Sequence, residues 1–143
     1  MELIKRIIIL LSSLLLASCS GESEINLNAL SLEEDVFVSG KGLMSLEHGL
    51  HPLEDQSAKQ ETLLIGVHGS SSRGYEWVYP LKTMDSPKTF TLFFRWNDKD
   101  CPGPSYEKLR SSIYSILQTS PNLKEVMIAG HSYGALLVSM FAS

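Results

Sequence analysis

One short segment of the sequence combines residue types that could perform nucleophilic chemistry. Ser132 lies between Gly130 and Gly134 in the sequence Gly-His-Ser-Tyr-Gly. An apolar run at residues 126–129 precedes it and an apolar stretch at residues 135–142 follows, which predicts a strand, a tight turn and a helix. Such a turn strains the serine backbone, needs glycine at both flanking positions, and exposes the hydroxyl beside a helix N-terminus. We therefore predict that Ser132 is a nucleophile.

A second polar segment follows another apolar run, at residues 63–67. It begins with His68 and Gly69 and continues through a serine-rich turn that starts at Ser70. A continuous apolar run of this length is typical of a strand that is buried on both faces of a parallel sheet. Because the carboxyl ends of parallel strands meet at one edge of the sheet, this turn is a candidate partner for Ser132.

Together the two segments resemble the α/β-hydrolase superfamily, and the resemblance covers residues 62–143. In that superfamily a His-Gly motif supplies part of the oxyanion hole, and Gly-x-Ser-x-Gly supplies the nucleophile. The resemblance implies that Ser132 attacks the substrate and that the backbone N–H groups of Ser70 and Tyr133 bind the oxyanion. The residues that would support the two motifs are His68, Gly69, Gly130 and Gly134. We expect His68 to order its loop through hydrogen bonds rather than to act as the base.

The same resemblance implies a reaction class. We expect a serine esterase or lipase that cleaves a carboxylic ester, in a small molecule or a lipid, through an acyl-serine intermediate. Thioesterase and peptidase activities remain open. No cofactor is expected, and His48 and His51 lack a third ligand at a spacing typical of metal sites, so we predict no metal either.

The catalytic base and acid are missing from the sequence. A serine hydroxyl needs a base to accept its proton and a carboxylate to orient that base, and the superfamily places both after the serine. Residues 133–143 contain no Asp, Glu or His. We therefore expect a piece of a longer hydrolase that is inactive as written. The alternative is a non-catalytic lipoprotein that uses a hydrolase-like half-sheet as an interaction module.

The elements that must position these residues predict an α/β fold with a mostly parallel sheet between helices, a partial α/β-hydrolase fold without its later strands. We predict strands at 63–67, 90–94 and 126–129, and helices at 76–84, from Ser105 to before Pro121, and at 135–142. Ser105 is the expected N-cap, with Glu107 near the positive end of the helix dipole. The last helix is apolar all round and should be buried, whereas the strand at 126–129 should be an exposed apolar edge.

The region before residue 62 is less regular. Residues 36–38 and 43–46 are short strand candidates, and residues 49–60 have the composition of a loop. Residues 19–34 are polar with single apolar residues, as in a tether, so the folded domain is expected at residues 35–143.

The N-terminus carries a targeting signal. Residues 1–18 place Lys5 and Arg6 before a short apolar run, which is typical of a secretory signal peptide and too short for a membrane span. The sequence Leu-Ala-Ser-Cys ending at Cys19 resembles the lipobox of bacterial lipoproteins, in which the cysteine is acylated. We therefore expect a lipid anchor at the cell envelope, with the outer membrane preferred because Ser20 follows the cysteine.

Length and charge limit the remaining possibilities. A chain of 143 residues contains one small domain at most. Its formal net charge of -4 gives no general attraction for nucleic acid. Cys101 is the only other cysteine and lies among acidic residues, which disfavour a reactive thiolate, so we expect it to be incidental.

Overall fold

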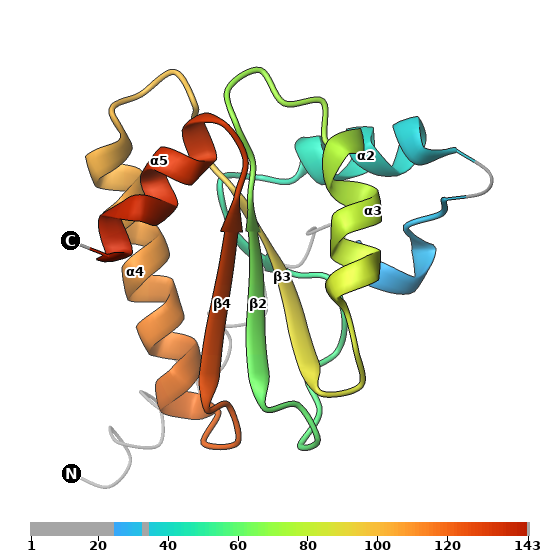
Figure 1. The fold of residues 1–143 in the computed structure, drawn as a ribbon, viewed down its shortest axis with the longest axis vertical. Coiled ribbons are helices and arrows are strands. Elements are labelled where there is room, and N and C mark those ends of the chain that lie inside the picture. Colours follow the sequence, from blue (N-terminus) through green and yellow to red (C-terminus); the bar gives the residue numbers. More distant parts are fainter. Residues whose placement is uncertain (1–24, 33–34, 143) are drawn as a thin grey trace, which may run out of the picture.

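A computed structural model describes residues 25–32 and 35–142, which form a four-stranded sheet flanked by helices (Figure 1). The predicted signal peptide and Cys19 lie outside the described residues. The strands are β1 Gly49–Pro52, β2 Thr62–Val67, β3 Thr89–Arg95 and β4 Glu125–Gly130. The helices are α2 Val36–Ser45, α3 Tyr75–Met84, α4 Pro102–Thr119 and α5 Tyr133–Ser139, with 3-10 turns η1 Leu27–Ala29 and η2 Met140–Ala142. In this part of the chain no helix has both the length and the apolar character to cross a membrane.

The sheet has the strand order β1-β3-β2-β4, in which β2 is parallel to both β3 and β4 and β1 is antiparallel to β3. The α/β prediction and the three strands predicted from residue 63 onward are confirmed. Val67 at the end of β2 pairs with Phe94 on one side and Gly130 on the other. The three parallel strands therefore end level with one another, and the turns that follow β2, β3 and β4 meet at the same edge of the sheet (Figure 1).

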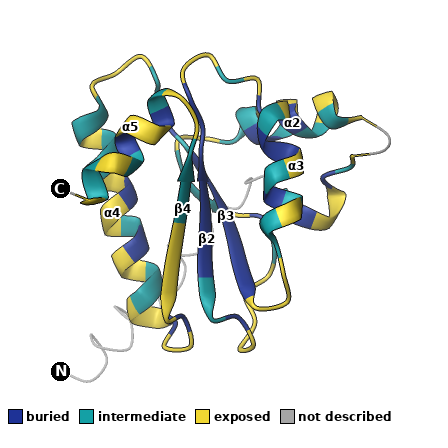
Figure 2. Cartoon of the chain, in the orientation of Figure 1, coloured by how far each residue is buried: buried dark blue, intermediate teal, exposed yellow. Residues whose placement is uncertain are grey.

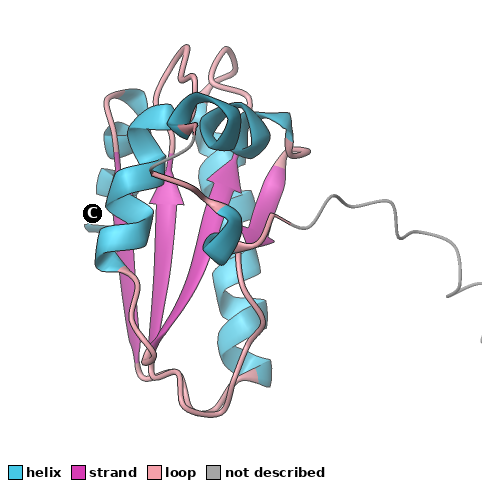
Figure 3. Cartoon of the chain, turned by 90° about the vertical axis from the view of Figure 1, so that its right-hand side faces the viewer, coloured by secondary structure: helices cyan, strands magenta, loops and turns pink. Residues whose placement is uncertain are grey.

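Helices cover both faces of the sheet, and the view turned by 90° from Figure 1 shows this layering (Figure 3). Successive residues of a strand point to opposite faces, so one strand can contribute side chains to the packing on both. One apolar core contains residues of the strands, of α4 and of α5: Leu63, Ile65, Val67, Phe90, Leu92, Phe94, Leu109, Ile113 and Leu137. The other core joins Phe93 of β3 to buried residues of α2 and α3, which are Leu43, Trp77, Val78 and Leu81. The sheet therefore packs against an apolar cluster on each of its two faces.

Helix α2 corrects the two strands predicted at residues 36–38 and 43–46. The Asp35 carboxylate accepts hydrogen bonds from the N–H groups of Phe37 and Val38, both at 3.1 Å, and so caps the helix N-terminus. A Cβ at Gly40 would lie 2.2 Å from the backbone N of Tyr75, so α2 packs directly on the start of α3. The cap and this helix contact outweigh the strand preference of the β-branched residues.

Strand β1 corrects the first part of the predicted loop, at residues 49–52, because its antiparallel pairing with β3 cannot be read from its own composition, whereas residues 53–60 form a loop as predicted. The predicted tether is also corrected in part. Leu27 and Leu30 are buried in the core beneath α2 and α3, so residues 25–30 are part of the folded unit.

The helix after β3 begins earlier than predicted. Helix α4 starts at Pro102, and Cys101 is its N-cap without a side-chain hydrogen bond, so Ser105 is not the cap and Glu107 lies beyond the first turn. Prolines suit the first turn, where the N–H groups have no intrahelical partner. The predicted apolar stripe of α4 is confirmed: Leu109 and Ile113 are buried, and Tyr106, Ile116 and Leu117 pack against the same core.

The edge of the sheet at β4 is exposed, as predicted. Val126 and Met127 are 36% and 46% exposed, and Figure 2 shows the open lower half of this strand. The prediction that α5 is buried all round is wrong, because Leu136 is 53% exposed. In the described part of the chain, α5 packs against β2, β4 and α4, which leaves its outer side open.

Candidate active site

Ser132 occupies a strained turn between β4 and α5. Its backbone has φ 53° and ψ -122°, a combination that residues with a side chain rarely adopt. Two hydrogen bonds close the turn, from Gly134 N to His131 O and from Ala135 N to Ser132 O, both at 2.9 Å. A third, from His131 N to Val67 O at 3.1 Å, ties the turn to the end of β2. The Ser132 side chain is exposed at the edge of the sheet where the parallel strands end.

The flanking glycines have a steric reason. A Cβ at Gly130 would lie 2.6 Å from Gly134 O and 2.7 Å from the Cα of Ala135. A Cβ at Gly134 would lie 2.4 Å from both Val67 O and His68 O, so α5 begins directly against the end of β2. Both contacts are with backbone atoms, which cannot rotate away. The tight turn therefore requires glycine at both positions.

The His-Gly turn after β2 lies directly against Ser132. A Cβ at Gly69 would lie 2.9 Å from the Ser132 Cβ and 2.6 Å from His131 O. Gly69 is buried, whereas Ser70, the next residue, is exposed. The parallel register of β2 and β4 explains the approach, because Val67 and Gly130 are paired at the ends of their strands. The structure thus brings together the two segments that the sequence singled out.

His68 is completely buried, and its hydrogen bonds define its tautomer. The backbone N–H of Trp96 and the guanidinium Nη1 of Arg95 both lie 3.1 Å from Nε2, and both groups can only donate, so Nε2 is the acceptor. The proton is therefore on Nδ1, which donates to Gly69 O at 2.9 Å. Trp96 also donates its indole N–H to His68 O at 2.9 Å. His68 acts as a fixed link between the turns after β2 and β3.

The bond from His68 to Gly69 O orients the next peptide group. The described residues contain no cis peptide bond, so the N–H of Ser70 points away from the Gly69 carbonyl and hence away from the His68 ring. Among the described residues, the backbone N–H groups of Ser70 and Tyr133 donate no hydrogen bond. Two unpaired N–H donors therefore flank Ser132, one on the turn after β2 and one at the start of α5.

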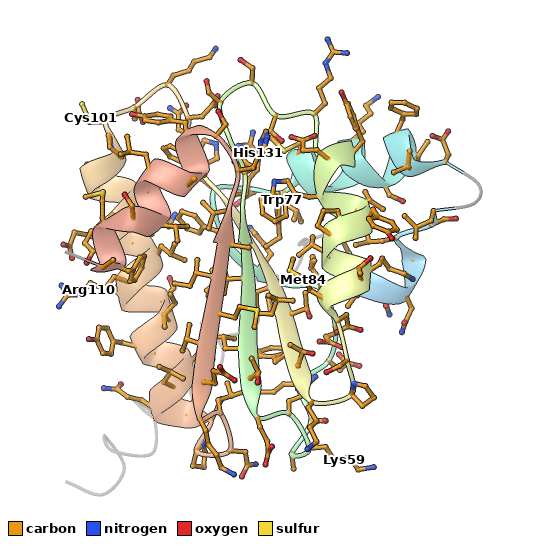
Figure 4. All side chains as sticks on the ribbon, viewed as in Figure 1. Lys59, Trp77, Met84, Cys101, Arg110 and His131 are labelled. Atoms are coloured by element: carbon orange, nitrogen blue, oxygen red, sulfur yellow. The ribbon has the colours of Figure 1, made fainter. Side chains whose placement is uncertain are left out.

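A general base is not in place among the described residues, because no histidine or carboxylate there hydrogen-bonds to the Ser132 hydroxyl. His131 is exposed at the upper end of the sheet in Figure 4, and its Nδ1 lies on the Gly69 side, 3.2 Å from where a Cβ of that glycine would be. His51 bonds to Glu47 O at 2.8 Å, in the loop before β1. Residues 25–32 and 35–142 also contain no cluster of three or more His, Cys, Asp and Glu side chains that could hold a metal ion.

Three residues at the end of β3 and in the turn after it belong to the site but were not predicted from the sequence. Arg95 and Trp96 bond to His68, and Asp98 accepts a hydrogen bond from Ser71 N at 2.6 Å. In the sequence they only mark the end of an apolar run. Their position at the carboxyl end of a parallel strand is the signal that could have identified them, since such strand ends meet the turn after β2.

Comparison with protein-family models, with curated proteins and with solved structures found no match. The described residues form an α/β protein with a strained serine turn, beside which the backbone N–H groups of Ser70 and Tyr133 donate no hydrogen bond to another described residue.

The free energy of unfolding is expected to decrease as the pH is lowered, because of His68. Burial, which disfavours the charged imidazolium, lowers the pKa of His68 and the nearby Arg95 guanidinium lowers it further. The unfolded chain, with an ordinary histidine pKa of about 6.5, therefore binds the proton first. The stability from neutral His68 is complete above that value and is lost as pH falls toward the lower pKa of the folded protein. Urea unfolding between about pH 8 and pH 5 should show a steeper loss in wild type than in His68→Gln. Equal slopes in the two proteins would contradict the assignment.

Proposed function

We propose that this protein is a serine hydrolase of the α/β-hydrolase type and that Ser132 is its nucleophile. The observation that carries the proposal is the conformation of Ser132 at φ 53°, after the end of β4 and beside two N–H groups that have no acceptor among the described residues. A strained backbone conformation lowers the stability of the fold, so it persists only where the surrounding structure enforces it, and such residues are concentrated at functional sites. The parallel β2 and β4 and the glycine contacts of the turn supply that support.

The proposed reaction is the cleavage of a carboxylic ester. The Ser132 oxygen attacks the ester carbonyl carbon, the carbonyl oxygen gains negative charge, and the Ser70 and Tyr133 N–H groups donate to it. Collapse of this tetrahedral intermediate breaks the bond to the alcohol, which leaves with the proton that the serine lost, and the acyl group stays on Ser132 until water releases it as the carboxylic acid. Each preorganised donor contributes about 3 kcal/mol to the stability of the transition state. The start of α5 adds the positive end of its peptide dipoles at the same place.

The attacking hydroxyl must also lose its proton to a base. Since no described histidine or carboxylate bonds to Ser132, the proposal assigns only the nucleophile and the two oxyanion donors. The histidine that is buried beside the site, His68, uses both ring nitrogens in hydrogen bonds to the backbone and Arg95, which leaves it no nitrogen for the serine proton.

A fluorophosphonate probe tests the proposal on the full-length protein, that is, this chain together with the segment that we expect to supply the base and the acid. The probe phosphonylates an activated serine, and peptide mapping by mass spectrometry should find the adduct on Ser132. An adduct on another residue would reject Ser132 as the nucleophile. No adduct at all would reject the enzyme and favour the non-catalytic interaction module, for which the exposed edge of β4 is an available surface.

We also propose that Cys19 carries a lipid anchor that holds the protein at the bacterial outer membrane. Acyl chains contribute about 0.8 kcal/mol per buried methylene, so more than one chain gives a stable anchor. Metabolic labelling with an alkyne fatty acid should modify wild type, and Cys19→Ala should lose the label. Cys101→Ala is the matched control, because this exposed thiol is the other cysteine of the chain and its loss should leave the label intact. Label that survives Cys19→Ala would contradict the anchor.

A further inference from the structure

The turn after β2 is held from a second direction, by the turn after β3. The Asp98 carboxylate accepts a hydrogen bond from the backbone N–H of Ser71 at 2.6 Å. Ser71 itself has φ 55°, a left-handed conformation that is unusual for serine. A carboxylate is a strong acceptor for a backbone N–H, and such charge-assisted bonds are short. The strained residue is therefore held by the strongest type of acceptor in the loop.

The two anchors hold the peptide group that contains the proposed oxyanion donor and the peptide group after it. His68 binds the carbonyl of the Gly69–Ser70 peptide, and Asp98 binds the N–H of the Ser70–Ser71 peptide. The N–H of Ser70 belongs to the first of these two peptide groups. The bond from His68 alone would let this peptide group turn about its carbonyl oxygen, and the second anchor, one residue further along, limits that rotation.

The charges around Asp98 suit an ionised carboxylate. Burial raises the pKa of Asp98, but the hydrogen bonds from Ser71 and Ser70 and the nearby His68 outweigh it, so its pKa lies below the ordinary value. Arg95, which bonds to His68, is a charged group that also interacts with this carboxylate. Asp98 is thus ionised at neutral pH and available as an acceptor.

We propose that Asp98 is a positioning residue that holds the Ser70 N–H in place for the oxyanion, by fixing the strained Ser71 that follows it. This inference rests on the proposed function, because it assigns a role within the same site. Asp98 touches neither the nucleophile nor the oxyanion. It acts through the loop, so its loss should slow the attack by Ser132 and leave the turn between β4 and α5 in place.

The first test measures the hydrogen bond without activity. In ¹⁵N spectra of the full-length protein, the Ser71 amide signal should shift as Asp98 takes up its proton in the acid range. The same signal should lose this pH dependence in Asp98→Asn, whose amide oxygen still accepts a hydrogen bond but does not titrate. A Ser71 signal that titrates equally in both proteins, or in neither, would overturn the inference whatever the activity.

The second test measures the rate of fluorophosphonate labelling at Ser132. Asp98→Ala should slow labelling about tenfold or more, since the loss of one oxyanion donor costs about a hundredfold to a thousandfold. Asp98→Asn should recover part of that loss. Asp100→Ala is the matched control: Asp100 follows the same strand but bonds to the side chain of Asn97 at 2.9 Å, and its loss should leave the rate unchanged.

The two tests separate the inference from the proposed function. If wild type labels at Ser132 and Asp98→Ala labels equally fast, the role of Asp98 is wrong while the hydrolase stands. If wild type does not label, the hydrolase is wrong and so is the role of Asp98 in it, even where the Ser71 signal titrates.

Discussion

Ser132→Ala is expected to abolish fluorophosphonate labelling and to lower ester hydrolysis by the full-length protein by about a thousandfold or more. The loss is large because the oxygen that forms the acyl-enzyme bond is removed, and the oxyanion donors then act only on attack by water. Hydrolysis of short-chain and long-chain p-nitrophenyl esters provides the rate measurement. Comparison of the two chain lengths also distinguishes an esterase from a lipase.

Two further variants separate chemistry from folding. Ser132→Gly lacks the hydroxyl but adopts a positive φ without strain, so it should lose labelling and gain about 1 kcal/mol in the free energy of unfolding. Ser139→Ala is the matched control, since the Ser139 hydroxyl bonds only to the Leu136 carbonyl within α5, at 2.6 Å, and its loss should leave both rates unchanged. Ester hydrolysis that survives Ser132→Ala at the wild-type rate would exclude Ser132 as the nucleophile.

Gly134→Ala is expected to lower the free energy of unfolding by about 3 kcal/mol or more. The added Cβ would lie 2.4 Å from the carbonyl oxygens of Val67 and His68. These oxygens cannot move separately from the sheet, because Val67 O also accepts the N–H of His131. Relief of the clash must push α5 away from β2, which opens the turn around Ser132. Urea unfolding measures the change, and labelling at Ser132 should fall with it.

Gly103→Ala is the matched control for this substitution. Gly103 lies in the first turn of α4, and a Cβ there would meet no atom within 4 Å. Its replacement should change the free energy of unfolding by no more than about 0.5 kcal/mol. A loss in Gly134→Ala as small as that in Gly103→Ala would show that α5 is not seated against β2 as described.

Much of the fold was predictable where the hydrophobic pattern is local. The runs at β2 and β3 are continuous and apolar because both faces of each strand are buried, and the periodic stripe of α4 follows from its one buried face. The run at β4 is also apolar, although this edge strand is partly exposed. Elements without such a pattern were mispredicted. Helix α2 depends on the Asp35 cap and on contact with α3, and β1 depends on pairing with β3. Neither α3 nor β3 is close in the sequence to the element that it supports.

The sequence by itself determined the serine, its flanking glycines and the His-Gly turn, because the chemistry and the steric limits of a tight turn restrict those positions to few residue types. Only the tertiary structure decided which groups hold the turn after β2. Arg95 ends a different strand and Trp96 and Asp98 follow it, and the parallel register of β2 and β3 brings them to His68 and Ser71. Strand register depends on packing across both faces of the sheet, so the orientation of the proposed oxyanion donor is a property of the folded sheet rather than of its own segment.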